Sequence, residues 1–316
     1  MLSLLISRRL PDSVMAAAEA RFDVTCRATT QPMDHAECVA ALRDHDLILP
    51  SLGDAFTAQA FADVPAPKAK LLANFGVGYN HIDVGAARAA GVEVSNTPGA
   101  VTDATADIAL TLILMTARRA GEAERMVRAG AWTGWHPTQM LGMHVSGKTV
   151  CVVGMGRIGQ AIAKRCHFGF GCPIVYVNRS QKQMDFPAEQ LPMDDALARA
   201  DIVVLAAPSG AETHHLMGAA QFAAMKPTAI FVNISRGDVV DEAALIAALE
   251  AGQIAGAGLD VFEFEPAVPD ALRAMENVTL LPHLGTAALE VREDMGRMAL
   301  DNVIAVAEGR AAPNAV

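Results

Sequence analysis

The sequence has no apolar run long enough to cross a membrane and lacks the charge pattern of a signal peptide. Its longest apolar stretch, residues 108–115, is followed by Arg118 and Arg119 and is far shorter than the roughly 20 residues that a membrane-spanning helix needs. The apolar N-terminus precedes Arg8 and Arg9, which reverses the charge order of a signal peptide. We therefore expect a soluble, cytoplasmic protein with no membrane partner.

Paired cysteines and an excess of positive charge are also missing. The five cysteines are an odd number without a Cys-x-x-Cys pair, which disfavours a disulfide framework or a zinc site and predicts buried free thiols. With 25 Lys and Arg against 35 Asp and Glu, the formal net charge is −10, so the surface should repel nucleic acid and anionic membranes. Any anion that binds must meet a local positive site.

Apolar residues, by contrast, are plentiful. They make up 52% of the 316 residues, whereas charged residues make up only 19%, below the roughly 25% that is typical of soluble domains. Such a chain folds around large buried cores, which excludes a disordered or fibrous protein. Its length corresponds to about two domains.

Short, nearly all-apolar runs alternate with Ala-rich helical stretches, a pattern that predicts parallel sheets covered by helices. The first part of the chain has five such predicted strands, at residues 2–7, 23–27, 47–50, 70–75 and 92–96. The later part has six, the number expected for a doubly wound dinucleotide-binding domain, at residues 149–153, 174–177, 201–207, 229–234, 255–261 and 278–281.

Two long helices connect these series. The segment 102–119 is apolar nearly all round, so we expect it to be buried between domains or subunits, and a Gly/Trp/Pro-rich loop at 130–142 follows it. The last helix, residues 286–309, has its simplest position against the first domain. We predict an α/β protein of two doubly wound parallel-sheet domains, Rossmann-like or flavodoxin-like: a discontinuous domain of residues 1–98 and 286–316, and a dinucleotide-binding domain of residues 99–285.

A glycine-rich turn follows the strand predicted at 149–153 and opens a helix. It has the pattern Gly-x-Gly-x-x-Gly and consists of Gly154, Met155, Gly156, Arg157, Ile158 and Gly159. In this setting the first glycine permits the tight turn, the second lets a pyrophosphate approach the backbone, and the third lets the helix pack on the strand. The free N–H groups of the helix N-terminus attract an anion. We predict a dinucleotide site here; the alternative is a turn that serves packing only.

The end of the next strand bears on the choice of cofactor. An NAD-preferring site usually has an Asp or Glu there, which accepts hydrogen bonds from the ribose. This chain has Asn178, Arg179 and Ser180 instead. Arg179 offers a planar cation and Ser180 a hydroxyl to a 2′-phosphate, so NADP(H) is predicted over NAD(H). The alternative is an arginine on a solvated loop, and Lys182 fits either interpretation.

Three further motifs end strands of the same domain. They are residues 233–237 with Arg236, residues 258–266 with Asp260, Glu263 and Glu265, and residues 281–286 with His283. Ligands of doubly wound sheets bind at the carboxyl ends of the strands, so these side chains can converge on one crevice.

These motifs, the glycine turn and a Gly-rich segment at 74–83 make essentially the whole chain resemble the D-isomer-specific 2-hydroxyacid dehydrogenase family. Within the family the chain is most similar to glyoxylate/hydroxypyruvate reductases, which often carry Arg-Ser or Arg-Thr after the second strand. The resemblance implies an active site in the cleft between the two domains. It also implies NADPH-dependent reduction of a small 2-oxo acid, such as glyoxylate or hydroxypyruvate, to the D-2-hydroxy acid.

The resemblance assigns roles to particular residues. Arg236 would bind the carboxylate and carbonyl of the 2-oxo acid, and His283 would protonate the carbonyl oxygen as hydride arrives, a task suited to an imidazole. Glu265 would pair with His283, although Glu263 competes for this role. The remaining substrate contacts would come from Leu52, Val77 and Gly78.

Further cofactor contacts follow from the same resemblance. Asp260 would lie near the nicotinamide carboxamide; alternatively it caps a strand end. The other implied cofactor-binding residues are Pro208, Ile234, Ser235, Arg236, His283 and Gly285.

Several alternatives stay open at this stage. Other family members, such as phosphoglycerate, D-lactate or formate dehydrogenases, are possible, although a formate enzyme would carry Gln in place of Glu265. A non-enzymatic dinucleotide-sensing co-repressor is a different class. We expect a homodimer through residues 102–119, with Trp132 and Trp135 near the neighbouring subunit. His214 and His215 are expected to cap a helix start and lie at the surface, not to bind a metal.

Overall fold

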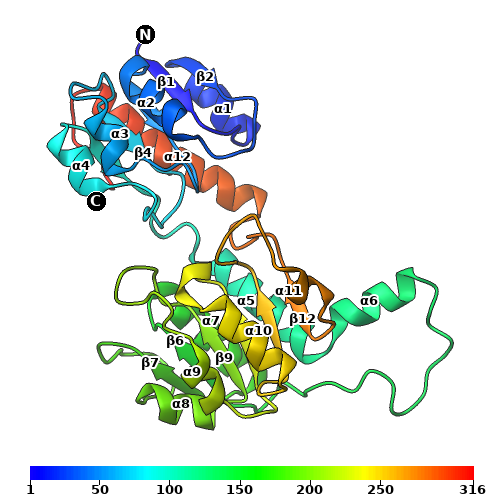
Figure 1. The fold of residues 1–316 in the computed structure, drawn as a ribbon. Coiled ribbons are helices and arrows are strands. Elements are labelled where there is room, and N and C mark those ends of the chain that lie inside the picture. Colours follow the sequence, from blue (N-terminus) through cyan, green and yellow to red (C-terminus); the bar gives the residue numbers. More distant parts are fainter. The chain divides into compact units, whose positions relative to one another are not determined.

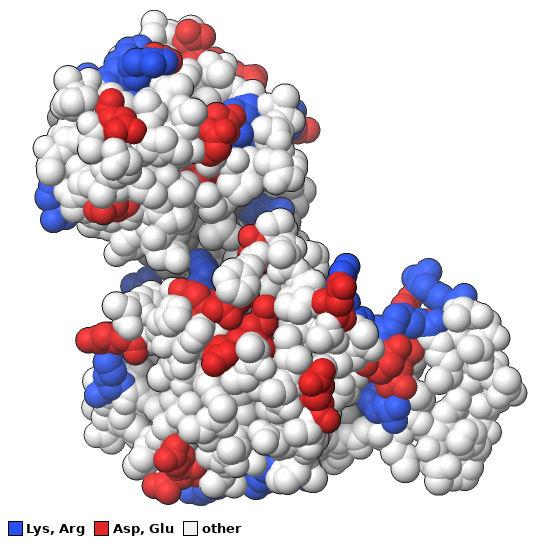
Figure 2. Space-filling model, viewed as in Figure 1, with Lys and Arg blue, Asp and Glu red and all other residues white.

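The structure is a computed structural model that describes residues 1–316. The chain divides into two compact units: unit 1, residues 1–101 and 286–316, and unit 2, residues 102–285. Each unit is a parallel sheet covered by helices (Figure 1), as the alternating pattern predicts. Lys and Arg side chains are interspersed with Asp and Glu on the face drawn in Figure 2, which shows no broad basic area.

Unit 1 contains a five-stranded sheet of order β2-β1-β3-β4-β5, the order of flavodoxin-like folds. Its strands are β1 (Ser3–Ile6), β2 (Asp23–Cys26), β3 (Leu47–Leu49), β4 (Leu71–Ala73) and β5 (Glu93–Ser95). Its helices are α1 (Asp12–Glu19), α2 (His35–Asp44), α3 (Ala58–Ala62), α4 (Val84–Ala89) and α12 (Leu289–Ala307). Strands β3 and β4 are buried along their whole length, which explains why they read as short, purely apolar runs.

The C-terminal helix α12 belongs to unit 1. It packs against α1 and β4, and Ser13 donates a hydrogen bond to Glu293 at 2.6 Å. Gly296 permits this close packing, because a Cβ atom there would lie 2.7 Å from the Val14 side chain.

Unit 2 contains a seven-stranded sheet of order β12-β11-β10-β9-β6-β7-β8. Its strands are β6 (Val150–Val153), β7 (Ile174–Val177), β8 (Ala188–Gln190), β9 (Ile202–Leu205), β10 (Ile230–Asn233), β11 (Gly256–Leu259) and β12 (Val278–Leu280). The strand order reverses between β6 and β9, which is the point where doubly wound sheets bind ligands. The expected count of six strands is too low by one: β8 is a partly exposed edge strand with no apolar run to reveal it.

The helices of unit 2 cover both faces of this sheet. They are α5 (Thr102–Ala117), α6 (Ala120–Arg128), α7 (Arg157–Phe170), α8 (Met193–Arg199), α9 (Ala219–Ala224), α10 (Glu242–Glu250) and α11 (Asp270–Ala274). Helix α5 packs against β10, β11 and α7 of its own unit. No helix in the structure combines the length and hydropathy that a bilayer span requires.

Helix α6 is not predicted by the sequence pattern. The chain turns at Arg119, whose φ of 52° lies in the left-handed region, and a separate helix with no buried residue begins at Ala120. In Figure 1, α6 and the irregular segment after it extend away from the rest of unit 2.

The cysteines are free thiols, as predicted. Cys38, Cys151, Cys166 and Cys172 are buried, and Cys26 is half-buried. Burial raises the pKa of Cys151 to about 12, so this thiol is inert at neutral pH.

Candidate active site

The glycine turn after β6 has the contacts that its pattern predicts. Gly154 has a φ of 98°, and a Cβ atom on it would lie 2.5 Å from the amide nitrogen of Ala207. A Cβ atom on Gly159 would lie 2.1 Å from the carbonyl oxygen of Gly154. Only glycine allows β6, α7 and the segment after β9 to approach so closely.

The middle glycine of the turn faces open space. No atom lies within 4 Å of the position that a Cβ on Gly156 would take. Gly156 is the N-cap of α7, and its carbonyl accepts the first helical hydrogen bond, from Gln160, at 2.9 Å. The N–H groups of Arg157 and Ile158 precede that bond and are available to an anion. The residues therefore fit a pyrophosphate.

The loop after β7 lies beside this turn. Asn178 accepts a hydrogen bond from the Met155 amide at 3.2 Å and donates one to the Ser180 carbonyl at 2.7 Å. Arg179 is 90% exposed, and its Nη1 lies 3.1 Å from Glu212 Oε2. The sequence pattern does not indicate Glu212, because this carboxylate comes from the turn after β9 and not from the end of β7.

The chain after β10 is shaped around Asn233. Its side chain donates to the Arg236 carbonyl at 3.1 Å and accepts from the Ser235 amide at 2.9 Å. The next residue, Gly237, packs so tightly that a Cβ atom would lie 1.9 Å from the Phe262 carbonyl carbon. These contacts of Asn233 and Gly237 hold the backbone of Arg236 against the segment that follows β11.

The guanidinium of Arg236 has an unsatisfied donor. Its Nη1 donates to the Ser235 carbonyl at 2.7 Å, but its Nε is buried without a hydrogen-bond partner. Burial lowers the pKa of Arg236, against the opposing charges of Glu265 and Asp238, yet a guanidinium stays protonated at neutral pH. Because an unpaired buried donor is costly, this group suits an anionic ligand.

His283 and Glu265 form the pair that was expected. His283 Nδ1 lies 2.9 Å from Glu265 Oε2, and both side chains are about 30% exposed. Glu265 Oε1 accepts from the Phe262 amide at 3.0 Å. Burial acts to raise the pKa of Glu265. The hydrogen bond and charge of His283, the hydrogen bond from the Phe262 amide and the charge of Arg236 together outweigh it, so this pKa lies below its ordinary value. Glu265 is therefore a carboxylate at neutral pH and fixes the imidazole through Nδ1.

Asp260 holds the loop that carries His283. It is 1% exposed, and its two carboxylate oxygens accept from the amides of Leu284 at 2.6 Å and Gly285 at 2.9 Å. Its own carbonyl accepts from the His283 amide at 2.9 Å. Burial raises the pKa of Asp260, against these N–H groups and the charge of His283. Asp260 therefore caps the chain that follows β12, which is the second of the two roles considered for it.

Glu263, the competing acid, faces another partner. Its Oε1 lies 2.7 Å from His215 Nε2, so Glu265 and not Glu263 contacts His283.

The expectation that His214 and His215 lie at the start of a helix is wrong, because they lie in a turn after Pro208. Thr213 stabilises this turn by donating to the Pro208 carbonyl at 2.7 Å.

The expected substrate-binding residues of unit 1 lie in two surface loops. Leu52 and Val77 are 38% and 37% exposed. Asn74 donates to the carbonyls of Gly76 and Gly78, both at 3.0 Å, and so holds the Gly-rich loop. Arg8, to which no sequence motif points, donates to the Leu52 carbonyl at 2.9 Å.

Comparisons with known proteins agree with this architecture. Residues 110–285 match the family described as D-isomer specific 2-hydroxyacid dehydrogenase, NAD binding domain. The chain is 42% identical over 319 residues to a glyoxylate reductase of Thermococcus onnurineus (strain NA1), covering 99% of this chain and 95% of the relative. It is also 42% identical to glyoxylate/hydroxypyruvate reductase B of Klebsiella pneumoniae (strain 342), covering 99% and 98%.

A solved structure has the same fold along the whole chain. The NADPH-dependent glyoxylate/hydroxypyruvate reductase of Sinorhizobium meliloti, in complex with NADP and malonate, superposes with a TM-score of 0.88 at 34% identity, covering 100% of this chain and 96% of that one. The fold and site thus define a dinucleotide-dependent oxidoreductase. The chain belongs to the D-isomer-specific 2-hydroxyacid dehydrogenase family.

Proposed function

We propose that this enzyme uses NADPH to reduce a small 2-oxo acid, glyoxylate or hydroxypyruvate, to the D-2-hydroxy acid. The names of the relatives support the substrate class. The observation that carries the proposal is the buried, unpartnered Nε of Arg236 on the same sheet edge as the His283–Glu265 pair. The Arg236 guanidinium suits a substrate carboxylate, and the His283–Glu265 pair suits a carbonyl oxygen that gains a proton.

The cofactor site is proposed from the residues that fit it. The glycine turn and the N-terminus of α7 would hold the pyrophosphate, and Arg179 and Ser180 would hold the 2′-phosphate. Pro208, Ile234, Ser235 and Gly285 follow strands at the same edge and are proposed as further contacts, with Asp260 near the nicotinamide. The bound cofactor supplies a hydride to the substrate carbonyl carbon.

The chain's own residues perform the rest of the reaction. Arg236 binds the carboxylate and the carbonyl oxygen. The backbone N–H groups of Val77 and Gly78 are proposed as further substrate contacts. Leu52 limits the size of the substrate. His283, held at Nδ1 by Glu265, donates the Nε2 proton to the carbonyl oxygen and is reprotonated from solvent.

A kinetic panel tests the proposal. The protein is assayed for NADPH and NADH oxidation with glyoxylate, hydroxypyruvate, pyruvate and bulkier 2-oxo acids. We expect the highest kcat/KM with glyoxylate or hydroxypyruvate, and chiral chromatography of the hydroxypyruvate product should give the D-isomer. A preference for pyruvate would favour a lactate-type enzyme, and no turnover with any 2-oxo acid would favour the dinucleotide sensor.

Replacement of Arg179 tests the cofactor preference. Arg179→Asp should lower the ratio of kcat/KM with NADPH to that with NADH by about ten- to a hundredfold, because it removes a charge-assisted hydrogen bond and repels the 2′-phosphate. Arg199→Ala is the matched control, since Arg199 also pairs with an exposed glutamate, Glu189 at 2.6 Å, and its ratio should not change. An unchanged ratio in Arg179→Asp would remove Arg179 from this role.

A homodimer in the cytoplasm remains the predicted state. Its interaction surface is proposed to extend from α5 to α6 and the segment after it, where α6 has no buried residue and Trp132, Trp135 and Leu141 are exposed. A second copy would cover these apolar side chains.

A further inference from the structure

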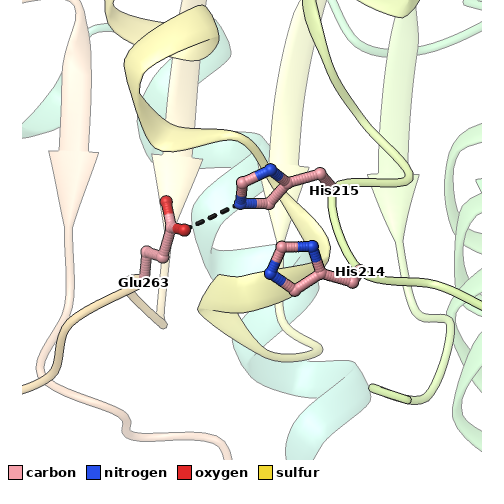
Figure 3. A group of neighbouring side chains, drawn as sticks. All are labelled: His214, His215 and Glu263. Carbon is pink, nitrogen blue, oxygen red and sulfur yellow. Dashed lines mark hydrogen bonds and ion pairs between the residues drawn. The ribbon is translucent and has the colours of Figure 1, made fainter. Parts of the chain in front are cut away.

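A second group of chemically reactive side chains lies in unit 2, apart from the His283–Glu265 pair. His214 and His215 come from the turn after β9, and Glu263 comes from the segment after β11. Figure 3 shows the two imidazole rings lying one over the other, with the Glu263 carboxylate facing the ring of His215. The three residues can each offer one ligand atom, and these atoms all lie within 4.8 Å of one another.

The group is held in place by contacts outside it. The ring centroids of His214 and His215 are 3.9 Å apart, and the His215 amide donates to the Asp238 carbonyl at 2.9 Å. Glu263 is 13% exposed in its side chain, and its second oxygen accepts from the Glu242 amide at 3.2 Å. The carboxylate is therefore oriented before any ligand binds, while the exposed ring of His214 forms no hydrogen bond and is free to ligate.

The charges around the group favour a cation. The Glu263 carboxylate lies 2.7 Å from His215 Nε2, and the negative charges of Asp238 and Asp241 also act on this ring. Acidic side chains gather on the face of unit 2 covered by α10 (Figure 2). A metal ion near Nε2 of His215 would meet these negative charges.

We propose that His214, His215 and Glu263 bind a divalent transition-metal ion such as Zn²⁺, with solvent completing the coordination. Two imidazoles and one carboxylate are a donor set that suits Zn²⁺. On binding, the proton between His215 Nε2 and Glu263 Oε1 goes to solvent, and the ion bridges the two atoms. The ion would link the turn at residues 211–215 to the segment that carries Glu265 and would stabilise both.

The experiment uses the full-length chain, freed of metal by chelation and of any polyhistidine tag, in a Cys26→Ser background that removes the partly exposed thiol. Co²⁺ is titrated and followed by its visible absorption, and Zn²⁺ is titrated by calorimetry and by thermal unfolding. We expect one Co²⁺ per chain, displacement by Zn²⁺, and a rise in Tm with Zn²⁺.

His214→Ala is the decisive variant, because it removes an exposed ligand and leaves the His215–Glu263 pair intact. Its affinity for Zn²⁺ should fall by at least about tenfold, and the Zn²⁺-dependent rise in Tm should disappear. His35→Ala is the control: His35 pairs with Asp63 at 2.8 Å without belonging to the group, and its affinity should match that of the parent.

Two results would overturn the proposal. One is the absence of saturable Zn²⁺ or Co²⁺ binding up to about 1 mM of the free ion. The other is binding that His214→Ala leaves unchanged. The first result would leave His215 and Glu263 as a structural hydrogen-bonded pair only, and the second would mean that His214 is not a ligand.

Discussion

Replacement of His283 by alanine is expected to lower kcat for 2-oxo acid reduction by about a thousandfold, within the range found for loss of a general acid. The product of hydride addition is an alkoxide, and in the proposed mechanism His283 is the group that neutralises it. The contact between His283 Nδ1 and Glu265 Oε2 at 2.9 Å leaves Nε2 to carry the transferred proton. Steady-state kinetics with glyoxylate and NADPH measure the loss.

The same variant should still bind cofactor. The proposed pyrophosphate site is built from the turn after β6 and not from the loop of His283, so NADPH binding measured by fluorescence should remain detectable. His35→Ala is a suitable control, since His35 is an exposed histidine of unit 1 that pairs with Asp63 at 2.8 Å and lies outside every proposed site. Turnover at the wild-type rate in His283→Ala would mean that another group donates the proton.

Much of this site could be predicted because it depends on local sequence. The glycine turn and the motifs around Arg236, Glu265 and His283 each follow a strand of one parallel sheet. Three of these strands, β6, β10 and β11, are buried along their whole length. In a parallel sheet, side chains at strand ends share one edge, so their meeting does not require knowledge of distant packing.

The sequence pattern does not predict contacts between loops that lie far apart in the sequence. Which acid meets His283 depends on how the segment after β11 folds: Glu263 turns to His215, while Glu265 turns to His283. The partner of Arg179 is likewise 33 residues away, at Glu212. Charge and spacing in the sequence could not indicate these pairings, because each depends on the course of a loop; the expectation that Glu265 meets His283 came from the family resemblance alone.

Elements without a strong apolar pattern were also missed. Strand β8 is partly exposed, and α6 has no buried residue, so neither produces the run or stripe of apolar residues by which the other elements were found. The fold can therefore be predicted where burial selects the residues, and only the structure places the parts that remain at the surface.

Replacement of Arg236 by glutamine is expected to lower kcat/KM for glyoxylate by roughly two to four orders of magnitude, the range for losing one partner of a buried charge pair. The Nε of this guanidinium is buried with no partner in the chain, so a substrate carboxylate would satisfy a donor that is otherwise unpaired. Arg236→Lys should recover only a small part of the loss, because an ammonium keeps the charge but lacks the planar fork.

A substrate without a carboxylate separates binding from a general loss of structure. The ratio of kcat/KM for glyoxylate to kcat/KM for acetaldehyde should be much lower in Arg236→Gln than in the wild type. A damaged fold would instead lower kcat/KM for both substrates together and leave the ratio unchanged. Circular dichroism and NADPH binding check that the variant is folded. Asn233 and Gly237 hold the backbone of Arg236 through contacts that do not involve its guanidinium. The glutamine side chain should therefore leave the loop in place. An unchanged ratio would show that the substrate carboxylate binds elsewhere.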